Sequence, residues 1–104
     1  MKLKSFKIPT FEEWEKKECK VRLELGAYCV EVRAFSWGRD GTTYMFAASL
    51  ADRNPLNIYT PQIFSRRFEY VGDDMALKEW YNNTALEFNQ FFENLLRKTY
   101  LEEE

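Results

Sequence analysis

The chain of 104 residues contains no histidine, two cysteines, four glycines and three prolines. Without histidine it lacks the side chain that most often serves as a general base or a metal ligand near neutral pH. The glycines do not form a phosphate-binding loop. No apolar run reaches the roughly 20 residues that a transmembrane helix needs. These absences argue against histidine-dependent catalysis, zinc binding, nucleotide binding and a membrane span.

What is present indicates one folded domain covering residues 1–104. Apolar residues make up 45%, aromatic residues 17% and charged residues 31% of the chain, which is typical of a globular protein. Residues 73–104 carry three basic and eight acidic groups, and the remainder is mildly basic. This asymmetry is too weak to predict non-specific nucleic-acid binding. The basic lead over residues 1–9 has no apolar signal stretch behind it, so we expect a cytoplasmic protein.

Helical signals stand at both ends of the sequence. Thr10 and Glu13 form a capping box and predict a short helix over residues 10–18, whose apolar side is Phe11 and Trp14. Residues 73–101 form the strongest helical pattern, beginning with acidic residues that suit a helix N-terminus. Its broad apolar face comprises Leu77, Trp80, Tyr81, Thr84, Ala85, Phe88, Phe91, Phe92, Leu95 and Leu96.

Between the helices, alternating apolar and polar residues predict strands within residues 19–71. Pairing Leu25 with Tyr28 across a Gly26-Ala27 turn brings the apolar residues of the segments 19–25 and 28–37 onto one face. The segment 42–50 joins the same face if residues 39–41 form a three-residue loop that ends in Gly41. This pairing places Ala34 opposite Phe46.

A fourth strand is expected over residues 63–71, with Phe64, Phe68 and Tyr70 facing inward. Arg66 shares that parity, which predicts a position at the sheet edge, where its head reaches water. The role of residues 51–62 stays open. The fold class predicted is α+β: a short helix, a four-stranded antiparallel meander and a long helix packed on one sheet face.

No constellation in the sequence predicts catalysis, so we expect a non-enzyme without metal or cofactor. Cys19 and Cys29 have opposite strand parity, and we therefore expect two free thiols, with Cys29 the more exposed. No histidine is available to activate either thiol. The carboxylates show no regular spacing that would predict an acid–base pair.

The predicted outward face of the sheet carries the candidate protein-binding site. On the predicted register Phe35 lies opposite Met45, with Trp37 beside them and the turn residues nearby. Two interpretations are open: the N-terminal helix covers this patch with Phe11 and Trp14, or the patch docks a partner. The candidate site residues are Arg33, Phe35, Trp37, Arg39, Asp40 and Met45.

The leading functional hypothesis is a non-catalytic module that binds another protein; no membrane partner is expected, and a homodimer is compatible with the pattern. Small size, an acidic pI and an antiparallel sheet with a long helix are similar in type to many phage or mobile-element accessory proteins. These include stoichiometric inhibitors of bacterial defence systems such as anti-CRISPR proteins, although no motif transfers residues from them. The alternative is a single-stranded nucleic-acid binder that stacks bases on sheet aromatics beside arginines.

Overall fold

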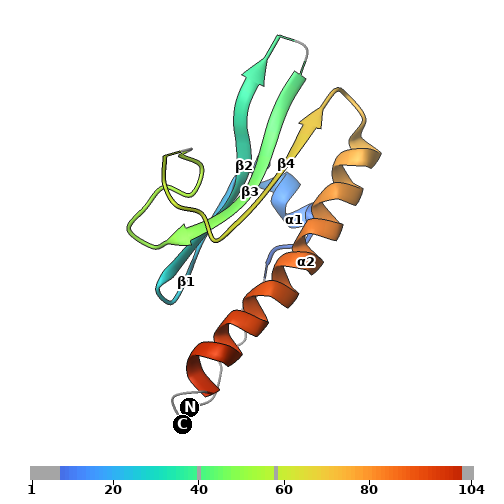
Figure 1. Cartoon of the computed structure of the whole chain (residues 1–104). Helices are drawn as coiled ribbons and strands as arrows, with labels where there is room; N and C mark the ends of the chain where they lie inside the picture. The colour runs from blue at the N-terminus through green and yellow to red at the C-terminus, as the bar shows by residue number, and fades with distance from the viewer. Residues whose placement is uncertain (1–7, 40, 58, 102–104) are drawn as a thin grey trace.

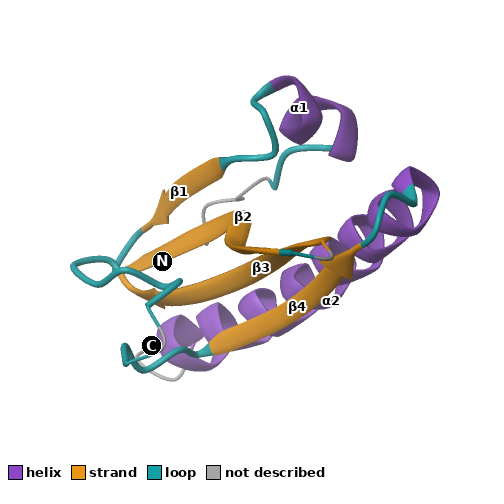
Figure 2. Ribbon diagram, turned by 90° about the horizontal axis from the view of Figure 1, so that it is seen from above, coloured by secondary structure: helices purple, strands orange, loops and turns teal. Residues whose placement is uncertain are grey.

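The computed structural model describes residues 8–39, 41–57 and 59–101, so most of the predicted basic lead and the candidate residue Asp40 lie outside it. The predicted α+β fold is confirmed (Figure 1). In chain order the elements are α1 (Phe11–Lys16), β1 (Val21–Leu25), β2 (Tyr28–Gly38), β3 (Gly41–Leu50), β4 (Phe64–Tyr70) and α2 (Asp74–Leu101). The strands form one antiparallel sheet in the order β1-β2-β3-β4, and Figure 2 shows α2 running along its β4 side.

The first hairpin has the predicted register. Leu25 pairs with Tyr28, Leu23 with Val30 and Val21 with Val32. Gly26 opens the turn with a φ of +67°, a conformation that suits glycine at the first position of a two-residue hairpin turn. The apolar residues of both strands consequently share the face that packs against the helices, which we call the helix face.

The predicted second turn is wrong, because a β-bulge changes the pairing. Ala34 pairs with Tyr44 rather than Phe46, Gly38 pairs with Gly41, and the loop has two residues instead of three. Phe35 is the extra residue in β2, between the pairs of Ala34 and Ser36. The extra residue of a bulge exchanges the sheet faces of the residues that follow it. Without this exchange, a two-residue turn would place Tyr44 and Phe46 on the opposite face. Tyr44, Phe46 and Ala48 still reach the helix face as predicted.

Strand β1 begins two residues later than expected. Glu18 and Cys19 adopt φ values of +59° and +57°, so they reverse the chain after α1 instead of extending it. The Cys19 N–H donates to the Trp14 carbonyl at 2.9 Å, which completes this reversal. Cys19 is partly buried against the helix-face core, whereas Cys29 is fully buried on the other face. The expectation that Cys29 is the more exposed thiol is therefore wrong, although both cysteines are free as predicted.

Helix α1 lies on the same sheet face as α2 and is fixed there by Trp14. The predicted capping box is confirmed, with reciprocal hydrogen bonds between Thr10 and Glu13. The Trp14 side chain is fully buried, its ring stacks on Tyr81 at 4.6 Å, and its Nε1 donates to the Val32 carbonyl at 2.9 Å. The short helix thus gains from tertiary contacts the stability that its length cannot supply.

Helix α2 begins where the acidic residues predicted it would. The Asp73 carboxylate accepts from the Ala76 N–H at 3.0 Å and caps the helix N-terminus. The predicted apolar face packs on the sheet: Phe88 contacts Phe46, and Trp80 stacks on Phe68. Among the predicted face residues, the side chain of Leu96 lies outside the described part of the structure.

The segment 51–62 had no predicted role; its described residues 51–57 and 59–62 lie on the side of the sheet opposite the helices (Figure 1). We call this the outer face. The Ala51 N–H donates to the Ala27 carbonyl at 2.9 Å, and the Asn54 carboxamide accepts from the Leu56 N–H at 3.0 Å. These bonds hold Leu56 against Met45 and Ala47, which form a second small core. The sheet is therefore buried on both faces at its centre.

The position of Trp14 predicts a strong and selective effect of substitution. Trp14→Phe removes the indole donor to Val32 and part of the ring, so the free energy of unfolding should fall by about 1–3 kcal/mol. Urea denaturation followed by circular dichroism measures this. Trp37→Phe is the matched control at an exposed tryptophan and should change nothing; an equal loss in both variants would contradict the assignment.

The burial of Cys29 predicts two distinct thiol reactivities. In denaturant, titration should find two thiols per chain without reductant. In the native state Cys29 should react much more slowly than Cys19, because Cys29 is fully buried and Cys19 only partly; burial raises the pKa of both thiols. Mass-spectrometric mapping of the labelled cysteine distinguishes the two, and first labelling of Cys29 would contradict the structure.

Candidate functional site

The outer face carries three of the predicted site residues together. Across the sheet, Arg33 of β2 pairs with Met45 of β3, which pairs in turn with Arg67 of β4. Phe35 packs against the Met45, Ala47 and Leu56 core, and the Arg67 guanidinium lies 4.9 Å from the centre of its ring. This arrangement is a cation–π contact. The outer face thus carries an aromatic ring under the Arg67 guanidinium, with Arg33 two residues before Phe35 on the same strand.

Trp37 does not belong to this group. Beyond the bulge at Phe35 the strand faces are exchanged, so Trp37 lies opposite Thr42, on the face that also carries Tyr44 and Tyr70. The expected neighbourhood of Phe35, Trp37 and Met45 is therefore wrong. Trp37 is 76% exposed, and Arg39 in the adjoining turn is also exposed.

The covering of Met45 also differs from both interpretations of the sequence. Met45 is fully buried, so it is not part of an open docking patch. Its cover is Leu56 from the 51–62 segment together with Phe35, not Phe11 and Trp14, which lie on the helix face. The N-terminal helix packs instead against α2, on the helix face.

A charged cluster adjoins this site on the outer face. Glu31 is buried and forms ion pairs with Arg22 and with Arg33, whose Nε lies 3.3 Å from the Glu31 Oε2. The hydrogen bond with Glu31 raises the pKa of Arg22. Both arginine side chains remain nearly half exposed, at 46% and 44%. The cluster ties β1 to β2 and presents positive charge to solvent.

Arg67 is the residue of this site that the sequence analysis missed. The sequence could have placed Arg67 on the outer face, because Phe64, Phe68 and Tyr70 face inward and the odd residues of the predicted fourth strand therefore face outward. Its neighbour could not be found, because the pairing of β4 depends on the path of residues 51–62. Arg66 lies on the edge strand as predicted, with its guanidinium bonded to Glu87 of α2.

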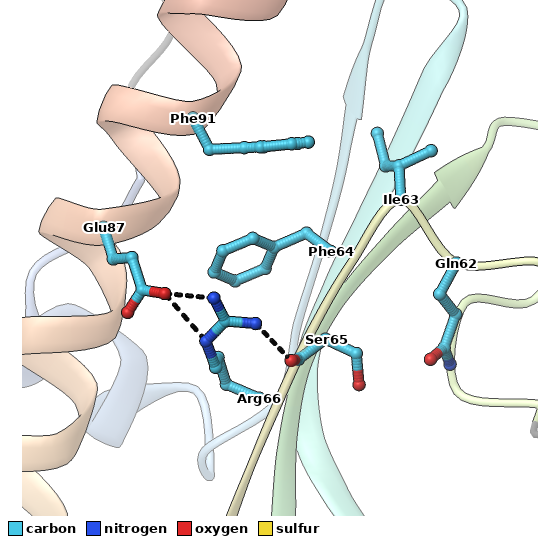
Figure 3. A pocket seen from close by; sticks show the side chains of 7 residues that line it. All are labelled: Gln62, Ile63, Phe64, Ser65, Arg66, Glu87 and Phe91. Carbon is cyan, nitrogen blue, oxygen red and sulfur yellow. Dashed lines mark hydrogen bonds and ion pairs between the residues drawn. The ribbon is translucent and has the colours of Figure 1, made fainter.

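A second feature is an open groove of about 450 Å³ between β4 and α2 (Figure 3). Phe64 and Phe91 supply its aromatic lining, at a ring distance of 5.6 Å. The ion pair of Arg66 with Glu87 crosses from the strand to the helix at its side. The lining residues are Gln62, Ile63, Phe64, Ser65, Arg66, Glu87 and Phe91.

Neither feature assembles a catalytic constellation among the described residues. Within residues 8–39, 41–57 and 59–101, no group of three cysteine or carboxylate side chains is placed to hold a metal ion. Burial raises the pKa of Tyr81, whose hydroxyl donates to the Pro9 carbonyl at 2.6 Å in a structural contact. The outer face and the groove both present arginine and aromatic side chains.

Comparisons with protein-family models, curated proteins and solved structures found no match to this chain. A search of the described helices found none with the length and apolar character needed to cross a membrane.

The locations of Met45 and Trp37 predict opposite responses to truncation. Met45→Ala opens a cavity under Leu56 and should cost about 2–5 kcal/mol of stability. Its melting temperature should fall by roughly 10 °C or more. Trp37→Ala removes an exposed ring and should shift the midpoint by only about 2–4 °C at most, corresponding to a surface change within about 0.5 kcal/mol. Thermal melts of the two variants test this, and a large fall for Trp37→Ala would place that ring in the core.

Proposed function

We propose that this protein is a non-catalytic protein-binding module whose β2–β3 hairpin inserts into a partner. The observation that carries the proposal is Trp37: a large aromatic side chain, 76% exposed, near the end of a hairpin that projects past β4 and the start of α2 (Figure 1). Tryptophan and arginine are the residues that most often anchor protein interfaces, and Arg39 lies in the same turn.

The structure around Trp37 suits such an anchor. The residues of the strand end pair across the hairpin, so Trp37 is held opposite Thr42 before any partner arrives. A side chain held in place loses less conformational entropy on binding than one on a loose loop. The exposed fraction of the ring provides apolar area for a partner to bury.

A stoichiometric inhibitor or adaptor in a phage or mobile element is the biological role that we infer for such a module. Small size, an acidic chain and a recognition hairpin support this role, in which binding alone blocks or recruits a larger protein. A cytoplasmic location and the absence of enzymatic activity remain predictions that accompany it.

The second candidate is single-stranded nucleic-acid binding on the outer face, which the Phe35 and Arg67 contact favours. Base stacking beside arginines is the usual chemistry of such sites. Against it, Phe35 is half-buried against Met45 and Leu56, and Arg67 already lies over its ring. A base would have to displace the guanidinium, so the hairpin is the better-supported site.

An affinity capture from the native host tests the leading proposal with matched variants. The wild-type chain should retain a protein after nuclease treatment, whereas Trp37→Ala should weaken this complex by about 2 kcal/mol, or roughly thirtyfold in Kd. Tyr59→Ala is the control, since Tyr59 is 88% exposed but lies in the 51–62 segment. Equal retention by wild type and Trp37→Ala would contradict the hairpin as the binding site.

Salt dependence separates the two candidate functions. A protein partner that buries Trp37 should bind almost as well at 200 mM as at 50 mM salt. A nucleic acid held by arginines should lose affinity steeply over that range. Capture of nuclease-sensitive material alone, with an Arg67→Ala variant losing it, would reverse the ranking.

A further inference from the structure

Strand β4 leaves one edge of the sheet open. Its seven residues pair with β3 on one side, and no strand of the described chain pairs with the other. In a two-residue hairpin the flanking residues exchange hydrogen bonds, here Leu25 and Tyr28. Successive residues of a strand direct their backbone groups to opposite sides, and the pairings of β2, β3 and β4 carry this alternation across the sheet. The backbone N–H and C=O groups of Ser65, Arg67 and Glu69 therefore point away from β3. These groups can accept an added strand.

The charges on this edge are complementary to themselves. Arg67 and Glu69 stand two residues apart on the outer face, and neither forms an ion pair with another described residue. If a second β4 pairs antiparallel about Phe68, Arg67 of each copy lies opposite Glu69 of the other. A shift of two residues in one direction places Arg67 opposite Arg67, and in the other direction Glu69 opposite Glu69. Like charges directly opposite each other are unfavourable, so one register is selected.

The pairing is confined to the strand itself. Strand β4 ends at Tyr70, and the chain bends at Gly72, which has a φ of +96°. In this register residues 66–70 of one copy therefore lie opposite residues 70–66 of the other. Val71 and Met75, which are 74% and 80% exposed, follow directly after the paired residues.

We propose that β4 pairs with β4 of a second copy of this chain, forming a symmetric dimer with one continuous sheet. Both copies contribute the same surface, as a twofold interface requires. Two observations support this arrangement: the free edge of β4 has unpaired backbone groups, and the charges of Arg67 and Glu69 select the register. The interface does not use Trp37, so it goes beyond the proposed hairpin function and stands or fails separately.

Charge exchange tests the pairing. By sedimentation equilibrium, the wild-type chain should be dimeric in the micromolar range. Arg67→Glu and Glu69→Arg alone each create like-charge pairs and should weaken dimerisation by about tenfold or more. The double variant Arg67→Glu with Glu69→Arg restores opposite charges and should return the dimer to within about threefold of wild type. Arg39→Glu, an exposed charge change in the hairpin turn, is the control and should have no effect.

Amide hydrogen exchange provides a second readout that a merely unfolded variant would not reproduce. The amides of Arg67 and Glu69 should become protected as protein concentration rises, while circular dichroism confirms that every variant is folded. A wild-type chain that stays monomeric to about 1 mM overturns the proposal and leaves this edge to an extended segment of another protein. A dimer that the single charge reversals do not weaken, or that the double reversal does not restore, also overturns it.

Discussion

The packing of Trp14 is the interaction on which the arrangement of layers depends. Its indole donates to Val32, the last residue of β2 that pairs with β1, while its ring stacks on Tyr81 of α2. One side chain thereby joins the N-terminal helix, the central strand and the C-terminal helix. Phe11 and Tyr44 complete an aromatic cluster around it. Helix α1 occupies this part of the helix face, whereas Leu56 of the irregular segment after β3 covers Met45 and Ala47 on the outer face.

The bulge at Phe35 has a comparable influence on the surface. Phe35 keeps the outer face, under Arg67, whereas the added residue turns Trp37 to the opposite face, where it is exposed. Without it, the two aromatic side chains would share one surface and one function. With it, the outer face gains an internal aromatic contact, and the hairpin gains an exposed ring. The two candidate recognition surfaces of this protein are therefore separated by one backbone irregularity.

Period-two and helical patterns predicted much of this fold, because burial enforces them. The first hairpin register and the edge position of Arg66 followed from residues that must face either the core or water. The start of α2 followed from acidic residues that suit a helix N-terminus. The bulge did not, since a two-residue turn with a bulge and a three-residue loop give the same parity for Tyr44 and Phe46. The cover over Met45 was equally inaccessible, because Leu56 lies in a segment without periodicity. The alternation thus indicated which aromatic and arginine residues lie near the surface, but it did not reveal the bulge that separates Phe35 from Trp37.

The hydrogen bond from the Tyr81 hydroxyl to the Pro9 carbonyl joins residues 72 positions apart in the chain. The meander, in contrast, pairs only strands that are neighbours in sequence, so its hairpins can close over short loops. During synthesis, α1 emerges from the ribosome before the α2 residues that pack against it. The contacts of α1 with Tyr81 can therefore form only after α2 has been synthesised, whereas its hydrogen bond to Val32 needs only the first hairpin.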